Sequence, residues 1–163
     1  MENKLVTLYE VNRIISDNYF DKRRVFTTGV FDVPHIGHPR YLAEAKKQGD
    51  ILIVGIHSDG LVKERKGPDR PVYSEKERME FLSYYSSVDF VLKLEDQNMV
   101  YETIRKLRAS ILVVSETTED VDNCPSTMIN LFSSFMEVIV LGAQSEHHST
   151  DVIKIPKEEF TSK

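Results

Sequence analysis

The stretch that decides the expected fold is Thr27-Thr28-Gly29-Val30-Phe31-Asp32-Val33-Pro34-His35-Ile36-Gly37-His38. It ends an apolar run over residues 25–33 with two histidines, and a helix-like segment begins directly after them. In a strand–turn–helix unit the turn lies at the carboxyl edge of the sheet, where open α/β proteins bind ligands. Both imidazoles can then stand beside the first free N–H groups of the helix, which favour an anion. Gly37 leaves room for a phosphate, so the stretch predicts a phosphate site.

Two other interpretations fit the histidine pair when it is taken alone. His35 could be a hydrogen-bonded turn residue, with His38 packing at the helix start against the sheet. A zinc site would need at least one ligand more than two histidines provide. Cys124 is the only cysteine, and no glutamate follows His35 as in the His-Glu-x-x-His motif. The pair alone therefore leaves a packing role open beside the phosphate site.

The rest of the chain alternates continuous apolar runs with amphipathic segments. Continuous β-branched runs predict strands covered on both faces, and apolar residues at three- and four-residue intervals predict helices. We expect strands at residues 25–31, 51–56, 88–92, 111–114 and 138–141, and helices at 5–18, 39–48, 100–107, 125–133 and 149–155, with one more after Ser74. This alternation predicts an α/β fold, a single Rossmann-like domain whose central parallel sheet of about five strands is flanked by helices.

Length and composition fit an ordinary globular protein. The chain has 163 residues, of which 40% are hydrophobic and 29% charged, and its net charge of −5 argues against nucleic acid as a partner. One cysteine fits a reducing compartment, and no apolar stretch approaches the roughly 18 residues of a membrane span. We expect a cytoplasmic protein with no membrane partner. Its parts would be an N-terminal helix and lead-in (1–24), one domain (25–155) and a tail (156–163).

Several blocks of sequence together resemble a known family. They are Thr28-Gly29-Val30-Phe31-Asp32 through His38, Gly49 through Asp59, Lys63 through Val72, Glu75 through Val91 and, more weakly, Ser149 through Ile155. Their order is similar to that of the HxGH nucleotidyltransferases of the cytidylyltransferase type. The leading helix and the Lys-Gly-Pro-Asp-Arg-Pro-Val loop look most like bacterial heptose 1-phosphate adenylyltransferases. The chain also resembles ethanolamine-phosphate and glycerol-3-phosphate cytidylyltransferases.

The resemblance implies a reaction between a nucleoside triphosphate and a phosphorylated small molecule. A phosphate oxygen of the acceptor attacks the α-phosphorus of ATP or CTP, and pyrophosphate leaves. His35 and His38 would contact the nucleotide phosphates and stabilise the charge that develops on the pyrophosphate. An imidazole with a pKa near ~6.5 can donate in either protonation state around neutral pH. Mg²⁺ is expected to enter with the triphosphate, since the sequence shows no dedicated metal site.

The resemblance gives roles to three cationic residues as well. Lys63 and Lys66 would lie in a loop that closes over the triphosphate and the incoming phosphate. Taken alone, the run Lys-Glu-Arg-Lys that they bound is more typical of a solvated charged surface. Arg78 would face the phosphates, where a planar guanidinium can hold two phosphate oxygens at once.

A further set of nucleotide contacts is implied by the same resemblance. The backbone after the first strand would line the nucleotide cleft. Hydroxyl residues at a late helix start would bind terminal phosphates, although plain N-capping uses such residues too. The implied contacts are Thr28, Gly29, Val30, Phe31, Gly37, Ser149 and Thr150.

Two segments depart from the family pattern. Residues 115–118, Ser-Glu-Thr-Thr, replace a Lys-Gly-Gly-Asp-like turn, and residues 145–148, Ser-Glu-His-His, replace an Arg-Thr-x-Gly-Ile lead-in. A cationic turn is thus acidic here, and a phosphate-binding arginine is missing. We therefore expect an acceptor other than heptose phosphate, and a binding-only regulatory module of the same fold remains the alternative. Apolar and aromatic residues within 81–85 indicate either a homodimer face or extra core packing.

Overall fold

The computed structural model describes residues 4–118 and 120–144 of the chain. Strands within them are β1 (Arg24–Gly29), β2 (Ile51–His57), β3 (Phe90–Leu94), β4 (Ile111–Ser115) and β5 (Glu137–Leu141). Helices are α1 (Leu8–Asn18), α2 (Gly37–Lys46), α3 (Asp59–Lys66), α4 (Glu75–Ser83), α5 (Gln97–Lys106) and α6 (Pro125–Phe132). The expected alternation of strands and helices is confirmed, and the expected helix at 149–155 lies outside the described residues.

All the strand pairs of the central sheet are parallel, in the order β3-β2-β1-β4-β5. The central strand β1 pairs with β2 along its whole length, so that Gly29 lies opposite Ile56, and it pairs with β4 on its other side. The chain reverses its direction of winding between β1 and β4. The carboxyl edge at this reversal is where open α/β sheets bind ligands, and β1 delivers the histidine turn there.

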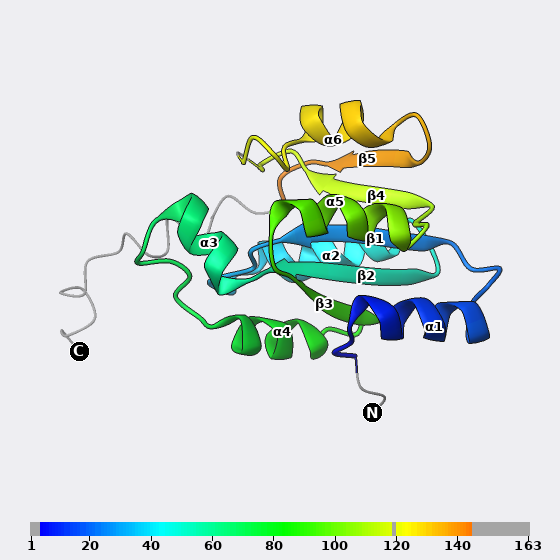
Figure 1. The fold of residues 1–163 in the computed structure, drawn as a ribbon, viewed down its shortest axis with the longest axis horizontal. Coiled ribbons are helices and arrows are strands. Elements are labelled where there is room, and N and C mark those ends of the chain that lie inside the picture. Colours follow the sequence, from blue (N-terminus) through cyan, green and yellow to red (C-terminus); the bar gives the residue numbers. More distant parts are fainter. Residues whose placement is uncertain (1–3, 119, 145–163) are drawn as a thin grey trace.

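Each face of the sheet carries its own apolar core. Helices α1, α5 and α6 bury Val11, Ile104 and Phe132 against one face of the strands. Helices α2 and α4 bury Leu42 and Leu82 against the opposite face. Figure 1 shows α5 in front of the sheet and α2 behind it, with α3 beyond the edge where the strands end. Strands covered on both faces explain the continuous apolar run of β2, whose seven residues are all buried.

Local capping explains two differences from the expected helices: a later start of the first helix and an additional helix, α3. Helix α1 begins at Leu8, because Thr7 and Glu10 form a capping box, and the preceding Leu5 makes a parallel β-bridge with Val91. Residues 59–66 form the helix α3, which the hydroxyl of Ser58 caps by accepting from the N–H of Leu61 at 3.2 Å. The expected loop around Lys63 and Lys66 was therefore wrong, since both lysines lie on this short helix.

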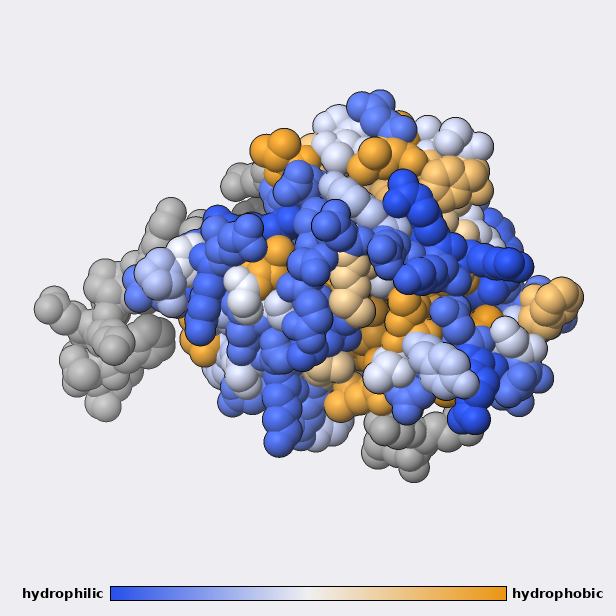
Figure 2. Space-filling model, in the orientation of Figure 1, coloured by the Kyte–Doolittle hydropathy of each residue, from blue (hydrophilic) through white to orange (hydrophobic). Residues whose placement is uncertain are grey.

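The exposure of individual side chains can be compared with the expected homodimer face at residues 81–85. Leu82 is buried in the core, whereas Tyr84 is 69% exposed and its hydroxyl bonds to Glu80. On the face shown in Figure 2, hydrophobic residues are visible near α6 and β5 and again below α5. Phe135 and Val140 are among the exposed large hydrophobic residues. A homodimer stays a prediction. Within the described ranges no helix is long and apolar enough to cross a membrane.

Gly55 tests how tightly the sheet packs just below its carboxyl edge. A Cβ at this position would lie 2.6 Å from Leu94 Cδ1 and 2.8 Å from Phe26 Cζ. We expect Gly55→Ala to lower the free energy of unfolding by about 1–3 kcal/mol, because both neighbours belong to a close-packed core. Urea unfolding measures the change. Gly60→Ala is the matched control, since its Cβ would meet only Ser58 Oγ at 3.7 Å, and an equal loss there would contradict the explanation.

Candidate active site

The two histidines of the turn come together beyond the end of β1. Their ring centroids lie 4.0 Å apart, and the ring of Phe31 packs edge-on against His38 at 5.4 Å. Phe31 adopts a positive φ of 50°, a rare conformation for a non-glycine residue, and this turns the chain sharply out of the strand. The expected convergence of His35 and His38 at the carboxyl edge is confirmed.

The start of α2 differs from the expectation of free N–H groups. The N–H of Gly37 donates to His35 Nδ1 at 3.2 Å, and the N–H of His38 donates to the His35 carbonyl at 3.0 Å. Pro39 has no N–H to offer. The first N–H groups of the helix are thus used within the turn, so an anion here would depend on the imidazoles. Because Nδ1 of His35 accepts a hydrogen bond, the proton of its neutral ring belongs on Nε2.

His38 is uncharged at neutral pH. Its pKa is lowered from 6.5 to about 4, with burial as the largest cause, the nearby His35 acting in the same direction and Asp32 opposing the shift. A neutral imidazole still carries one N–H donor, so His38 can donate a hydrogen bond without bringing a charge into the turn.

Arg78 does not hold the position that the sequence analysis gave it. Its side chain is fully buried, and Nη1 donates to the carbonyl of Val30 at 2.5 Å. Nε donates to the carbonyl of Tyr73 at 3.0 Å, while Nη2 donates to the His57 carbonyl and to Asp59 Oδ1, both at 2.8 Å. Four of its five N–H groups are therefore used by the protein. The expected fork for two phosphate oxygens is not available, and Arg78 instead ties the strand ends together.

Asp32 has a comparable role that the sequence analysis missed. This buried carboxylate accepts from the N–H groups of Val72 and Tyr73 at 2.8 and 3.1 Å and from Nε of Arg70 at 2.7 Å. These bonds fasten the loop after α3 to the turn that carries the histidines. Asp32 and Arg70 both stand in the quoted motifs, but no sequence pattern marks them as a pair, because they are far apart in the chain.

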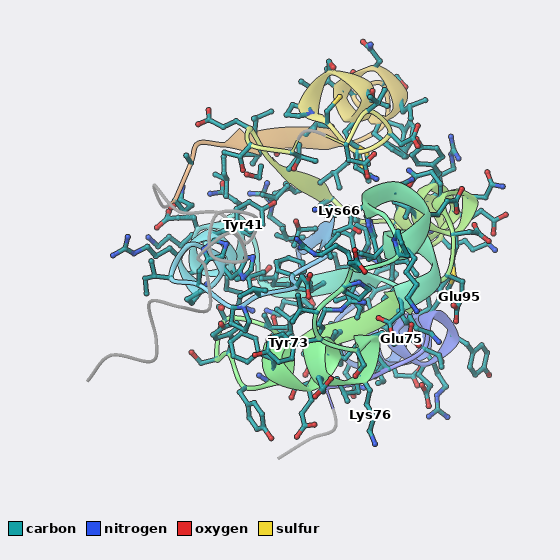
Figure 3. All side chains as sticks on the ribbon, turned by 90° about the vertical axis from the view of Figure 1, so that its left-hand side faces the viewer. Tyr41, Lys66, Tyr73, Glu75, Lys76 and Glu95 are labelled. Atoms are coloured by element: carbon teal, nitrogen blue, oxygen red, sulfur yellow. The ribbon has the colours of Figure 1, made fainter. Side chains whose placement is uncertain are left out.

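Helix α3 presents Lys63 and Lys66 on one face, since residues three apart on a helix are neighbours. Both are exposed, and Figure 3, which looks onto the carboxyl edge, shows Lys66 over the middle of the edge between α3 and α2. Arg65 lies between them in sequence and instead binds residues of α5 and of the segment before α6, which fastens α3 to this part of the edge. Its partners are Gln97, Asp120 and Asp122.

The acidic turn at residues 115–118 has a structural use. The N–H of Glu116 donates to the carbonyl of Leu141 at 2.9 Å, and its Oε1 accepts from the N–H of Ala143 at 2.7 Å. The carboxylate therefore holds the chain where it leaves β5. The implied contacts Ser149 and Thr150, and the altered lead-in at 145–148, lie outside the described residues.

The remaining implied contacts, residues 28–31, follow the edge of β1. Gly29 lies against the ring of Phe31, which a Cβ on the glycine would approach to 3.1 Å. The carbonyl of Val30 is already taken by Arg78, and the hydroxyl of Thr28 is buried without a hydrogen-bond partner among the described residues. Within those residues no group of three or more His, Cys, Asp or Glu side chains could hold a metal ion.

Replacing Arg78 tests its role as a structural hub. Arg78→Lys should lower the free energy of unfolding by about 3–5 kcal/mol, because one ammonium cannot satisfy four acceptors that the guanidinium holds in a buried place. Chemical denaturation measures the loss. Arg13→Lys, an exposed change on α1, should stay within about 0.5 kcal/mol. A harmless Arg78→Lys would contradict the hub.

The lowered pKa of His38 predicts acid-sensitive folding. The unfolded chain binds a proton at this residue near pH 6.5, whereas the folded chain does so only near pH 4. The free energy of unfolding is therefore not reduced by His38 above pH 6.5, and it falls as the pH drops from 6.5 toward 4. His38→Asn should reduce this fall by on the order of 1–3 kcal/mol, measured as the difference between the two unfolding profiles across that window. Parallel profiles would show that His38 is not buried as described.

Comparison of the sequence with known proteins found curated relatives with more than 40% identity. Bifunctional protein HldE of Campylobacter curvus is 45% identical over 112 residues, which are 69% of this chain and 24% of that protein. Bifunctional protein HldE of Campylobacter jejuni strain RM1221 is 42% identical over 119 residues, 73% of this chain and 25% of that protein. The chain thus spans about a quarter of the length of the curated relatives it matches.

Solved structures share the fold at lower identity. Pantothenate synthetase from Thermus thermophilus matches with a TM-score of 0.67 and 12% identity over 96% of this chain and 69% of that chain. A lipopolysaccharide core biosynthesis protein from Thermoplasma volcanium matches with a TM-score of 0.61 and 24% identity over 78% and 99%. The family model described as cytidylyltransferase-like matches residues 26–155. This match covers most of the chain, which therefore belongs to the cytidylyltransferase-like family of HxGH nucleotidyltransferases.

Proposed function

We propose that the chain transfers a nucleoside monophosphate group from ATP or CTP to a sugar phosphate or another phosphorylated small molecule, with release of pyrophosphate. The observation that carries the proposal is the pair of imidazoles 4.0 Å apart at the carboxyl edge of β1. Lys66 lies over the same edge. Membership of the family and the similarity to HldE proteins support nucleotidyl transfer to a sugar phosphate.

The histidines supply donors where charge develops. An arriving triphosphate brings several negative charges beside His38, which favours protonation of an imidazole that is neutral in the free protein. As the bond between the α- and β-phosphates breaks, negative charge grows on the pyrophosphate. The imidazole N–H groups of the turn would stabilise this charge by donating hydrogen bonds to the leaving oxygen. The turn needs no nucleophile of its own, because the acceptor phosphate attacks directly.

The lysines of α3 and Mg²⁺ would share the neutralisation of the triphosphate. The edge carboxylates Asp32 and Asp59 are engaged by Arg70 and Arg78, so they are poorly placed to hold a cation. The site therefore fits Mg²⁺ carried by phosphate oxygens and waters, which is its common manner of binding. Lys63 and Lys66 would act as exposed point charges over the β- and γ-phosphates and the acceptor phosphate.

The binding-only alternative loses its sequence argument in the structure. That argument is the acidic turn at residue 116, which would repel phosphates. Its carboxylate instead accepts from the N–H of Ala143 and holds the exit of β5. The charge of Glu116 therefore has a structural reason that does not require lost turnover.

A pyrophosphate assay tests the proposal. Each of the four nucleoside triphosphates is mixed with Mg²⁺ and with heptose 1-phosphate, mannose 1-phosphate, glycerol 3-phosphate or phosphoethanolamine. We expect turnover with ATP or CTP and at least one acceptor, and a loss of on the order of 10²-fold or more in kcat for His38→Ala. Ile36→Ala, an exposed change in the same turn, should keep its activity. Nucleotide binding without pyrophosphate in any mixture would refute the proposal, and best turnover on heptose 1-phosphate would refute the expected change of acceptor.

A further inference from the structure

Two side chains at the carboxyl edge have buried polar atoms that lack hydrogen-bond partners among the described residues. Both ring nitrogens of His57, a residue only 2% exposed at the end of β2, are unpartnered. So is the hydroxyl of Thr28, near the end of the neighbouring strand β1. Buried polar groups are nearly always paired, and leaving one unpaired costs stability. Two such groups on adjacent strand ends therefore call for a shared explanation.

The two side chains lie on the same face of the sheet. Successive side chains of a strand point to opposite faces. In β1 the hydroxyl of Thr27 bonds to Tyr41 of α2 behind the sheet, so Thr28 points to the front face. In β2, Ile53 packs in the front core and Ile56 in the rear core, so His57 also points to the front. Thr28 lies opposite Gly55, two residues from His57.

Apolar side chains and mostly cationic side chains surround Thr28 and His57. Phe26 and Leu94 fill the space over Gly55, where a Cβ would approach them to 2.8 and 2.6 Å. Arg65 and Lys66 of α3 lie near enough to His57 to lower its pKa, and Arg78 lowers it as well. Asp120 acts in the opposite direction. Burial is the largest cause of the shift, and all these causes together bring the pKa of His57 to about 4.

The chemistry of the pair fits a hydroxyl group. A neutral imidazole offers one donor and one acceptor, and a threonine hydroxyl offers the same combination. An alcohol can satisfy both residues at once because it too donates and accepts. A cationic ammonium group would instead meet the positive charge of Lys66, whereas Arg65 and Arg78 are already paired with carboxylates. The surroundings thus favour neutral hydroxyl groups over amino groups.

We propose that Thr28 and His57 form a hydroxyl-binding site for the acceptor, which selects phosphorylated sugars and polyols over phosphorylated amino alcohols. The proposal rests on the proposed function, and it adds the part of the acceptor beyond its phosphate. The acceptor phosphate would lie toward Lys66, and its hydroxyl-bearing carbons would lie toward Thr28 and His57.

Isosteric variants test this site. Thr28→Val removes the hydroxyl and keeps the shape, whereas Thr28→Ser keeps the hydroxyl. Thr103→Val is the matched control, because Thr103 is also buried with an unpartnered hydroxyl but lies within α5. With the best sugar or polyol phosphate, Thr28→Val and His57→Leu should raise the acceptor KM by about tenfold or more. The KM for the nucleotide should stay unchanged in His57→Leu, Thr28→Ser should keep the acceptor KM, and Thr103→Val should behave like the unmodified chain.

Phosphoethanolamine separates hydroxyl binding from general damage. Any turnover with it should change little in Thr28→Val, because it has no free hydroxyl to lose. An unchanged acceptor KM in both Thr28→Val and His57→Leu, with altered thermal stability alone, would overturn the proposal and indicate a structural water. An equal rise for all acceptors and for the nucleotide would overturn it too.

A second measurement does not depend on turnover. The ring nitrogens of His57 are followed by NMR, with the His57→Leu variant giving the assignment, while glycerol 3-phosphate or mannose 1-phosphate is added to the full chain. A shift of these signals that phosphoethanolamine does not produce supports the site, and no shift overturns it. If the unmodified chain releases no pyrophosphate, the proposed function fails, and this titration still decides whether the hydroxyl site exists.

Discussion

The buried guanidinium of Arg78 is the constraint on which the carboxyl edge depends. Its acceptors come from the ends of β1 and β2, the start of α3 and the loop before α4: Val30, His57, Asp59 and Tyr73. A charge removed from water is tolerated only when its donors are paired, so each of these segments is fixed relative to the others. The turn that carries the histidines and the helix that carries the lysines are thereby fixed at the same carboxyl edge of the sheet.

Charges that position the edge are paired, and most of them are buried or half-buried, while the charges proposed to meet a ligand are exposed. Asp32 and Arg70 form a second ion pair that fastens the loop after α3, with side chains 1% and 13% exposed. Arg65 holds α3 by its other side, and this leaves Lys63 and Lys66 at the surface. Because the positioning charges are already neutralised by protein partners, a bound phosphate would not compete with them. Within α3, Arg65 therefore positions the helix, while Lys63 and Lys66 are the residues proposed to meet the ligand.

The sequence predicted the sheet well and the hub poorly, for physical reasons. The β-branched run at 51–56 and the capping box at Ser74 act locally, so their pattern shows in the sequence. Three of the four acceptors of Arg78 are backbone carbonyls, which every residue type provides, and no sequence pattern marks them. The use of the α2 N–H groups by His35 depends on the turn conformation at Phe31, which is rare for a phenylalanine.

His38 and His57 have similarly lowered pKa values, yet their neighbours give them different roles. Besides burial, His38 has the carboxylate of Asp32 nearby, which favours its proton, and a triphosphate at the turn would act in the same direction. His57 is surrounded by Arg65, Arg78 and Lys66, which oppose protonation more than Asp120 favours it. The same burial therefore leaves one imidazole able to gain a proton when an anion arrives and keeps the other neutral. A ring that can become charged is suited to phosphates and a neutral ring to hydroxyl groups, so under the two proposals His38 would meet the nucleotide phosphates and His57 the hydroxyl groups of the acceptor.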